Sequence, residues 1–445
     1  MVFLTERLNE EAGNLIYSFA RAGIDVQTVI CGYDGYLPEG VLSPYGFYVN
    51  GKREPEKGFP RYFNQIDLPD FWEIESSPTS GEVREYEDLR AKLFYADPKS
   101  ERHLKVIDWL DKNGKVRCSD HYDRCGRRFA QTILDKNQKT VHKTYYDREG
   151  REVITENLNT GDIILTDGGK NCFFRSKAEF LAHFLQFSGL NTDRLFINSL
   201  STPFFAAESL RQMSGRKDGR NILFWQEPIR EDIPGNMRSI LDRGAAGVSL
   251  IAVQRQDAYR KIRDLAVDQT RFRKLGYIYP CLRKNGGTPN ALVFTNSDQV
   301  EKLGELARSL PQVHFHVGAL TEMSSKLMIM EMLENVTLYP GIWEEKIDDL
   351  WRKCDLYLDI NHGGEILEAV RTAFINDQLI LAFGSTAHNR SFTAPENIFE
   401  AENCQKMAER IRYVLADQSR MQAAVRAQRD CAHEASEKDY QDLLG

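Results

Sequence analysis

The sequence predicts an α/β protein made of two doubly wound, Rossmann-like domains, with an antiparallel β-meander domain inserted into the first. Two stretches of the chain alternate short apolar strands with amphipathic helices, which is typical of parallel sheets covered on both faces. A polar, Gly-rich segment at residues 283–289 separates these stretches. A third observation, a repeat of twelve residues, predicts the inserted domain.

The repeat lies between Leu110 and Asp167. Its turns open on residues twelve positions apart, namely Asp111, Asp123, Asp135, Asp147 and Asn159. An Asp or Asn side chain at the start of a turn can accept hydrogen bonds from the backbone ahead of it, and Gly near the end tolerates positive φ. The eight residues between turns suit one strand each, so the repeat predicts an antiparallel meander.

Apolar residues fall on both faces of this predicted sheet: Phe129 and Ile133 share one face of a strand, while Ala130 and Leu134 share the other. A sheet that covers a single core alternates cleanly. We therefore expect the sheet to lack a large core of its own and to lean either on the rest of this chain or on a second polypeptide. Under the second alternative each buried side chain contributes about 1.5 to 3 kcal/mol. The side chains that a partner would cover are Phe129, Ile133, Val141 and Tyr145.

At 445 residues the chain is expected to form two or three domains. Its net charge of −7 argues against a nucleic-acid surface. The eight cysteines include no Cys-x-x-Cys pair, and the first residues lack the basic-then-apolar order of a signal peptide, so we expect a reduced, cytoplasmic protein. Since no stretch approaches the roughly 20 apolar residues of a membrane span, any membrane association is expected to be peripheral.

The first wound domain is expected to be discontinuous, covering residues 1–42 and 166–282, with the meander domain at residues 43–165. Short apolar runs give its predicted strands, residues 1–4, 26–31, 194–198, 221–225, 247–253 and 276–280. Amphipathic runs give its predicted helices, residues 6–22, 177–187, 203–213, 234–241 and 254–266.

The second wound domain is expected over residues 290–402, followed by a helical tail at residues 403–445. Its predicted strands are residues 291–295, 313–317, 336–339, 355–360 and 378–383, and its predicted helices are residues 297–310, 320–333, 342–353 and 364–376. Two wound domains facing each other across a linker place a cleft at the carboxyl ends of both sheets. Trp225, Gln226 and Glu227 end a strand of the first domain, so we expect them to face this cleft and bind an acceptor substrate.

The second domain resembles the donor half of retaining glycosyltransferases of the GT-B fold. Residues 336–341 and 350–360 carry part of the resemblance, and the run Asn361-His-Gly-Gly-Glu-Ile-Leu-Glu368-Ala carries the rest. The resemblance implies that the turn at Gly363 and Gly364 opens a helix whose N-terminus faces a nucleotide diphosphate. Glu368, which precedes Ala, matches the second of two glutamates in the family signature.

Two features of that signature are missing. Ile360 stands where the family has its first glutamate, eight residues before Glu368, and residues 295–298 lack the family's basic pair, with only Lys302 further on in a predicted helix. Cationic groups normally stabilise the leaving diphosphate. We therefore expect no catalytic residue, no cofactor and a vestigial donor site at Gly363, Gly364 and Glu368. Glu368 itself could be a ribose ligand or a solvated, helix-capping side chain.

Other chemistry has little support in the sequence. His314 and His316 share a strand face, but no third ligand lies near them in sequence, so we expect core or surface histidines and no metal site. No serine stands in a nucleophile elbow, which argues against hydrolase chemistry.

Nearly the whole chain resembles the non-catalytic partner subunit, or stabilising protein, of the O-N-acetylglucosaminyltransferase of the bacterial accessory Sec system. The most specific segments are Leu15-Ile-Tyr-Ser, Asp34-Gly-Tyr-Leu-Pro-Glu-Gly40 and Leu42-Ser-Pro-Tyr45. The resemblance implies a chaperone-like subunit in a cytoplasmic heterotetramer with two copies of a catalytic sister glycosyltransferase. The complex would glycosylate serine-rich repeat adhesins before export, and any association with the inner face of the membrane is expected to be peripheral.

Three functions stay open at this stage. The first is the partner subunit, which stabilises and activates the sister enzyme and helps bind the adhesin acceptor. The second is an active retaining glycosyltransferase that uses a UDP-sugar, with Glu368 and the Gly363-Gly364 turn in an unusual donor site. The third is a structural scaffold that binds no acceptor. Binding of UDP-N-acetylglucosamine to the isolated chain separates the second function from the other two.

Overall fold

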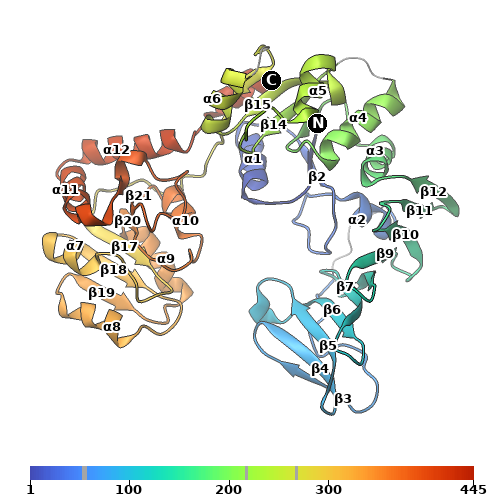
Figure 1. Ribbon diagram of the computed structural model, residues 1–445, viewed down its shortest axis with the longest axis horizontal. Helices are drawn as coiled ribbons and strands as arrows, with labels where there is room; N and C mark the ends of the chain where they lie inside the picture. Colours follow the sequence, from blue (N-terminus) through green and yellow to red (C-terminus); the bar gives the residue numbers. More distant parts are fainter. Residues whose placement is uncertain (53–57, 216–218, 266–268) are drawn as a thin grey trace. The chain divides into compact units, whose positions relative to one another are not determined.

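The computed structural model describes residues 1–52, 58–215, 219–265 and 269–445, and it consists of two compact units, Met1–Lys274 and Leu275–Gly445 (Figure 1). Each unit contains a six-stranded parallel sheet, and the first unit also contains a ten-stranded antiparallel sheet. The predicted α/β class, with two wound sheets and an inserted meander, is therefore confirmed.

The parallel sheet of the first unit has the order β16-β15-β14-β13-β1-β2. Its strands are β1 (Val2–Thr5), β2 (Gln27–Ile30), β13 (Leu195–Ile197), β14 (Asn221–Trp225), β15 (Val248–Val253) and β16 (Phe272–Lys274). Its helices are α1 (Glu10–Arg21), α2 (Pro44–Val49), α3 (Lys177–Phe187), α4 (Thr202–Ser214), α5 (Gly235–Arg243) and α6 (Gln256–Leu265). Helix α1 begins at Glu10, four residues later than predicted, because the Asn9 side chain caps it by accepting a hydrogen bond from Ala12 N at 3.1 Å.

The prediction of a strand at residues 276–280 is wrong. The last strand of this sheet, β16, comes earlier, and the backbone of the predicted segment is bound elsewhere. Tyr440 Oη donates to the Gly276 carbonyl at 2.8 Å, and Ala435 N donates to the Tyr277 carbonyl at 2.8 Å. Any side chain at Gly276 would collide with the His433 carbonyl, so this segment belongs to the second unit.

The antiparallel sheet follows the chain order from β3 to β12. Its strands are β3 (Trp72–Ser76), β4 (Ser80–Glu85), β5 (Asp88–Tyr95), β6 (Leu104–Leu110), β7 (Val116–Tyr122), β8 (Arg128–Leu134), β9 (Thr140–Tyr146), β10 (Glu152–Asn157), β11 (Ile163–Asp167) and β12 (Lys170–Phe174). The repeated turns have the predicted chemistry: the Asp111 carboxylate accepts from Asn113 N at 2.8 Å and from Lys115 N at 2.9 Å. Only the fifth turn is displaced, since Asn157 rather than Asn159 accepts the turn hydrogen bonds.

The sheet changes its buried face halfway along, which explains why its apolar residues divide between two faces. One row of cross-strand neighbours is fully buried at Leu93 and Ile107 but 41% exposed at Ile164 and 61% exposed at Phe173. The adjacent row, on the opposite face, is exposed at its β5 end and buried from β8 onward. Its members are Phe94, Val106, His121, Ala130, Tyr145, Ile154 and Leu165.

This chain supplies the cover for both halves of the sheet. Strands β3 to β7 form a small core of their own, which includes Val83, Leu93 and Ile107 and which side chains from residues 58–71 help to cover. Strands β8 to β12 share the main core of the first unit, where α2 and α3 lie against β9, β10 and β12 (Figure 1). Of the two supports considered for the sheet, the rest of this chain is therefore the one that the structure shows.

The loop at residues 34–40, one of the segments most specific to the family resemblance, packs against the β7–β8 turn of the meander. Gly35 has a φ of +85°, and a Cβ there would lie 2.8 Å from the Asp123 Cα and 2.9 Å from the Tyr122 carbonyl oxygen. Next to it, Asp34 forms an ion pair with Lys105 at 2.7 Å. Glycine is required at this point because the backbones of the loop and of the β7–β8 turn meet directly.

The sheet of the second unit has the order β19-β18-β17-β20-β21-β22. Its strands are β17 (Asn290–Phe294), β18 (His314–Gly318), β19 (Val336–Tyr339), β20 (Leu356–Asp359), β21 (Leu379–Phe383) and β22 (Ile398–Phe399). Its helices are α7 (Leu303–Ser309), α8 (Ser325–Met328), α9 (Glu344–Lys353), α10 (Ala369–Ile375), α11 (Cys404–Leu415), α12 (Gln418–Cys431) and α13 (Glu437–Leu444), with a 3₁₀ turn, η3 (Ile329–Met332), after α8. The tail packs on this sheet, since Met407, Ile411 and Met421 belong to its core.

Three predicted helices are shorter than expected. The helix predicted at residues 364–376 begins only at Ala369, because Leu367 and Glu368 have positive φ values of 59° and 45°. The helix predicted at residues 297–310 begins at Leu303, after Lys302 with a φ of 54°. In place of the helix predicted at residues 320–333, the structure has the single turn α8 and the 3₁₀ turn η3.

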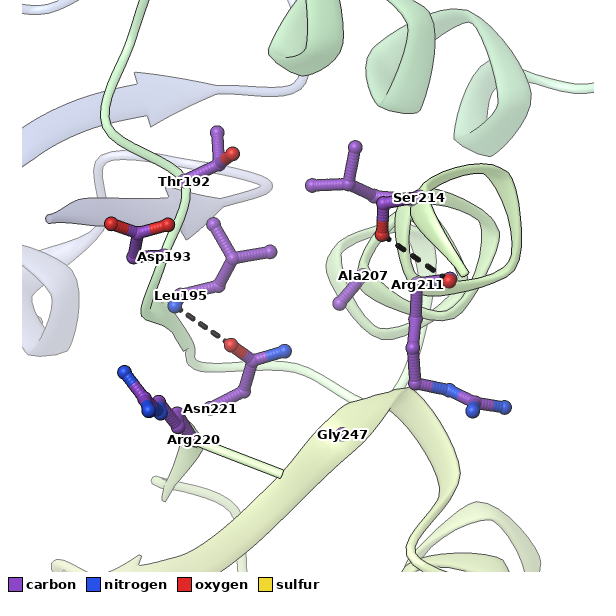
Figure 2. Close-up of a pocket in the computed structure, with 10 residues that line it drawn as sticks. Thr192, Asp193, Leu195, Ala207, Arg211, Ser214, Arg220, Asn221 and Gly247 are labelled. Carbon is purple, nitrogen blue, oxygen red and sulfur yellow. Dashed lines mark hydrogen bonds between the residues drawn. The ribbon is translucent and has the colours of Figure 1, made fainter. Parts of the chain in front are cut away.

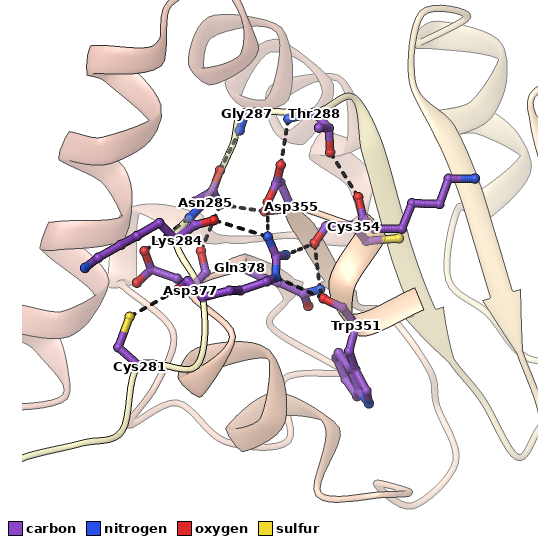
Figure 3. Close-up of polar contacts among 12 residues, drawn as sticks. Cys281, Lys284, Asn285, Gly287, Thr288, Trp351, Cys354, Asp355, Asp377 and Gln378 are labelled. Atoms are coloured by element: carbon purple, nitrogen blue, oxygen red, sulfur yellow. Dashed lines mark hydrogen bonds and ion pairs between the residues drawn. The ribbon is translucent and has the colours of Figure 1, made fainter. Parts of the chain in front are cut away.

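The Gly-rich linker is fastened to the second unit (Figure 3). Arg283 pairs with the Asp355 carboxylate at 2.6 Å, and the Thr288 backbone N–H donates to the same carboxylate at 2.7 Å. The Asn285 side-chain amide donates to the carbonyls of Asp355 and Asp377 at 2.9 and 2.8 Å. These bonds make the linker part of the second unit, although its composition suggests a flexible tether.

Candidate functional site

The two loops that would bracket a nucleotide diphosphate in the second unit are bonded to each other. One follows β17 and the other follows β20. The Asn361 side-chain oxygen accepts hydrogen bonds from the Thr295 hydroxyl at 2.8 Å and from Gly363 N at 3.0 Å. A Cβ on Gly363 would lie only 1.8 Å from the Asn296 side chain. The backbone N–H that the family resemblance assigns to phosphate binding is therefore occupied by a residue of this chain.

The helix that follows this turn is also capped internally. The Glu365 carboxylate accepts a hydrogen bond from Val370 N at 2.8 Å, in the first turn of α10. An anion is favourable at this position because helix N-termini carry free N–H groups and a partial positive charge. Glu368, by contrast, has an exposed side chain that makes no hydrogen bond within the part of the chain that the structure describes. The capping role is thus performed by Glu365.

A histidine that sequence reasoning missed holds the Gly363-Gly364 turn in place. His388 Nδ1 lies 2.5 Å from the buried Asp359 carboxylate, and His388 Nε2 lies 2.7 Å from the Gly363 carbonyl oxygen. Both neighbours can accept hydrogen bonds from the ring, an arrangement that favours the doubly protonated imidazolium. Burial alone lowers the pKa of His388, but the bonds to Gly363 and Asp359 outweigh burial and raise its pKa above the usual value.

Two candidate cations of the second unit are already paired within the chain. The positive charge of His388 is matched by Asp359. Lys302, the one basic residue that the sequence offers near β17, pairs with Glu305 at 2.8 Å instead. Neither of these two side chains is therefore free to compensate charge developing on a leaving diphosphate.

The carboxyl edge of the first sheet carries a row of three side-chain amides. Asn198, Gln226 and Gln254 follow β13, β14 and β15. The Asn198 amide donates to Gln226 at 3.0 Å, and the Gln226 amide donates to Gln254 at 2.9 Å. One acceptor of the row, Asn198 Oδ1, and one donor, Gln254 Nε2, are buried without a partner. This amide row is uncharged and has unused hydrogen-bonding capacity at both of its ends.

Two of the three predicted acceptor residues lie at this edge with accessible side chains. Gln226 is the central member of the amide row, and Glu227 is exposed. The Trp225 side chain is instead buried in the core beneath the edge. At the same edge, the Glu6 carboxylate accepts from the Ser201 hydroxyl and, at 3.2 Å, from Thr202 N at the start of α4. This helix N-terminus is therefore capped internally, like that of α10.

The four predicted interface residues of the meander occupy different environments. Phe129 and Tyr145 are buried in the main core of the first unit, so this chain itself covers them. Val141 is half-buried, and Ile133 is partly exposed on the face that also presents Ile164 and Phe173. We call the surface formed by Ile133, Ile164 and Phe173 the outer face.

The paired histidines are structural. His316 is buried, with its ring nitrogens 3.0 Å from the Tyr339 hydroxyl and 3.2 Å from the Asn290 side-chain oxygen. Burial lowers the pKa of His316 to about 3. In the described ranges, no cluster of three or more His, Cys, Asp or Glu side chains is arranged to hold a metal ion.

A pocket of about 130 Å³ lies at the opposite, amino-terminal edge of the first sheet (Figure 2). Arg211 and Arg220 line it, but their side chains point away from each other, and Arg211 is paired with Glu208 at 2.7 Å. Ligands of wound sheets bind at the carboxyl ends of the strands. We therefore assign no function to this pocket. Among the helices that the structure describes, none combines the length and the apolar character needed to cross a membrane.

Two wound domains with an inserted meander define a glycosyltransferase-like protein of the GT-B fold. Family models match the chain along most of its length: the GtfB N-terminal domain at residues 2–48, the GtfB middle domain at 72–175, the GtfB third domain at 177–265 and the GftB/GlyA-F C-terminal domain at 291–428. The chain belongs to the GtfB family.

Relatives that match the whole chain support this assignment. The chain is 39% identical to the UDP-N-acetylglucosamine–peptide N-acetylglucosaminyltransferase stabilizing protein GtfB of Streptococcus agalactiae, across 100% of this chain and 99% of that protein. It is 38% identical to the GtfB of Streptococcus gordonii, across 100% and 98%. It also matches a chain in a crystal structure of the GtfA/B complex bound to UDP and GlcNAc, with a TM-score of 0.90, 38% identity and coverage of 100% and 99%.

Proposed function

We propose that this chain is the non-catalytic subunit of a protein O-glycosyltransferase complex, in which it stabilises and activates a sister glycosyltransferase. The sister subunit binds UDP-N-acetylglucosamine and transfers the sugar to Ser and Thr. The observation that carries the proposal is the donor loop, where Asn361 and Glu365 occupy the N–H groups of Gly363 and Val370. The family of stabilising proteins to which the chain belongs supports the same division of labour.

The proposed contact with the sister transferase is the outer face of the meander. Ile164 and Phe173 are direct cross-strand neighbours there and form an exposed apolar pair on β11 and β12, while Ile133 lies on the same face three strands away, on β8. Apolar side chains of this size contribute to a stable interface when a partner removes them from water. Two copies of each subunit would form a heterotetramer if the sheets also meet each other.

A charge substitution tests this contact. Phe173→Asp should abolish co-purification of the sister transferase, because an aspartate cannot be buried there without a partner. Phe187→Asp is the matched control, since Phe187 is similarly exposed, at 64%, but lies at the end of α3. Full co-purification of the Phe173→Asp variant would show that the outer face is not the interface.

The proposed acceptor is a serine-rich repeat adhesin, modified in the cytoplasm before accessory Sec export, in a complex peripheral to the inner face of the membrane. We place its contact at Gln226 and Glu227, the accessible residues at the amide row. Side-chain amides can both donate to and accept from backbone groups and hydroxyls. A polar polypeptide bound in this way buries little apolar area, so its affinity should be modest.

Hydrogen exchange with a Ser/Thr-rich peptide tests the acceptor contact. Slower exchange is expected in the segments that contain Asn198, Gln226 and Gln254. Slower exchange confined to β3–β12 would contradict the proposed location and would leave the scaffold as the better explanation. Turnover of UDP-N-acetylglucosamine by this chain alone would instead favour the active glycosyltransferase.

A further inference from the structure

A row of polar side chains crosses the covered half of the meander, on the face that packs against α2. Thr132 on β8, Lys143 on β9 and Glu156 on β10 are direct cross-strand neighbours in this row. Thr132 and Glu156 are buried, and Lys143 is half-buried. Charged side chains are seldom placed in such surroundings unless each charge has a partner.

The Glu156 carboxylate is shared by donors other than its cross-strand neighbour Lys143. The Tyr45 hydroxyl donates to Oε2 at 3.4 Å, and Lys177 Nζ lies 3.6 Å from Oε1. Among the residues that the structure describes, the Lys143 amine forms neither a hydrogen bond nor an ion pair, and it lies 5.0 Å from the centre of the Tyr145 ring. We call Lys143, Lys177, Glu156 and Tyr45 the lysine cluster. Its donors outnumber its acceptors.

The other acceptors around Lys143 are also bonded elsewhere. The Thr132 hydroxyl lies 2.9 Å from His121 Nε2, and burial lowers the pKa of His121 to about 3, so this ring is uncharged. Asp34, whose charge also acts on Lys143, pairs with Lys105 at 2.7 Å. Burial lowers the pKa of Lys143 to about 8. The amine is therefore still mostly charged at neutral pH, and two ammonium groups face one carboxylate.

The lysine cluster lies close to the carboxyl end of β2. Cys31 directly follows β2, and burial raises the pKa of its thiol to about 12, while the charge of Lys177 acts in the opposite direction. Lys177 is therefore within electrostatic range of this strand end, and ligands of wound sheets bind at the carboxyl ends of the strands. The Lys177 side chain is 41% exposed, so the cluster is open to solvent.

We propose that Lys143 and Lys177 bind the carboxylate of a ligand. A carboxylate only accepts hydrogen bonds, so it supplies the acceptors that the lysine cluster lacks, and its single negative charge balances the single excess positive charge. Phosphate carries more negative charge at neutral pH, and Glu156 would repel the excess. This inference is independent of the proposed function, because it involves neither the outer face nor the amide row.

Thermal unfolding of the full-length chain in sodium acetate and in sodium chloride of equal ionic strength tests the site. Acetate should raise the unfolding temperature saturably, because a ligand that binds only the folded chain stabilises it. Lys143→Met keeps an unbranched side chain but removes the charge, so it should abolish the difference between the two salts, and Lys177→Met should reduce it. Lys139→Met, at an exposed position just before β9, should retain the full difference.

Two peptides identify the source of the carboxylate. A fluorescent Ser/Thr-rich peptide with one Glu should bind about fivefold or more tightly than the same peptide with Gln, and Lys143→Met should remove this preference. Equal binding of the two peptides, together with the acetate effect, would assign the site to a free carboxylate. The acetate effect does not depend on peptide binding, so it separates this inference from the proposed acceptor contact.

Three results would overturn the proposal. One is an equal unfolding temperature in acetate and chloride. Another is an acetate effect that persists undiminished in Lys143→Met, because acetate would then act on the protein surface in general. The third is a phosphate effect that exceeds the acetate effect and is lost in Lys143→Met, because the site would then select a different anion.

Discussion

Glu365 and Glu368 stand three residues apart and illustrate how side chains of one type differ in role. Both side chains are exposed, but only the Glu365 carboxylate accepts a hydrogen bond, from the backbone of Val370, among the described residues. The family resemblance identifies only Glu368, because that residue matches a sequence signature. The cap could not be predicted, since it depends on the left-handed backbone at Leu367 and Glu368.

Substituting each glutamate separates the two roles. Glu365→Ala should lower the free energy of unfolding of the second unit by about 1 kcal/mol, the usual cost of a lost N-terminal cap. Glu368→Ala should change it by less than about 0.5 kcal/mol and should leave the activity of the complex intact. Urea denaturation followed by tryptophan fluorescence measures both effects. An equal loss in both variants would contradict the assignment of the cap to Glu365.

His388 should make stability depend on pH. Its folded-state pKa is raised above about 6.5, so its contribution is fully present below that pH and is lost as the pH rises through the folded pKa. Burial raises the pKa of the paired Asp359. The ion pair is therefore also lost at low pH, when this carboxylate is protonated. His388→Gln would leave the buried Asp359 carboxylate without a charged partner, which is costly.

The expected cost of His388→Gln is about 1 to 3 kcal/mol near pH 6, and the difference from the unaltered protein should shrink at alkaline pH. Urea denaturation at several pH values measures this difference. A cost that stays constant across the range would show that His388 is neutral in the folded protein.

At the scale of elements, features that depend on residues close in sequence could be predicted, whereas features that depend on tertiary packing could not. The strands of the meander could be located from the Asp turns, because each turn is formed by its own residues. The change of buried face could not be predicted, since it depends on which element covers each half of the sheet. The late start of α10 was missed for a similar reason, because its loop is shaped by Asn361 and His388.

The brace at Gly35 gives an element-scale prediction with a matched control. Gly35→Ala should destabilise the first unit by about 2 kcal/mol more than Gly40→Ala does, because both residues have positive φ but only Gly35 meets another backbone. The left-handed backbone alone costs about 1 to 2 kcal/mol in each variant. Thermal unfolding of both variants tests this difference, and equal costs would show that the loop does not brace the meander.

At the scale of the whole molecule, carboxylates of this chain occupy the helix N-termini at the carboxyl edges of both sheets, where a ligand anion would otherwise bind. Glu6 caps α4 in the first unit, and Glu365 caps α10 in the second. The sequence predicts a degenerate donor loop at Gly363, Gly364 and Glu368, but the carboxylates that cap the two helices became visible only in the structure.

The central claim is that this chain does not bind a sugar donor. Calorimetric titration of the purified chain with UDP-N-acetylglucosamine tests it most directly, with the complex that contains the sister transferase as the positive control. The account predicts saturable heat from the complex and none from the chain alone. Saturable binding to the chain alone, weakened by substitution of Gly364 or Glu368, would contradict the account and restore the active glycosyltransferase.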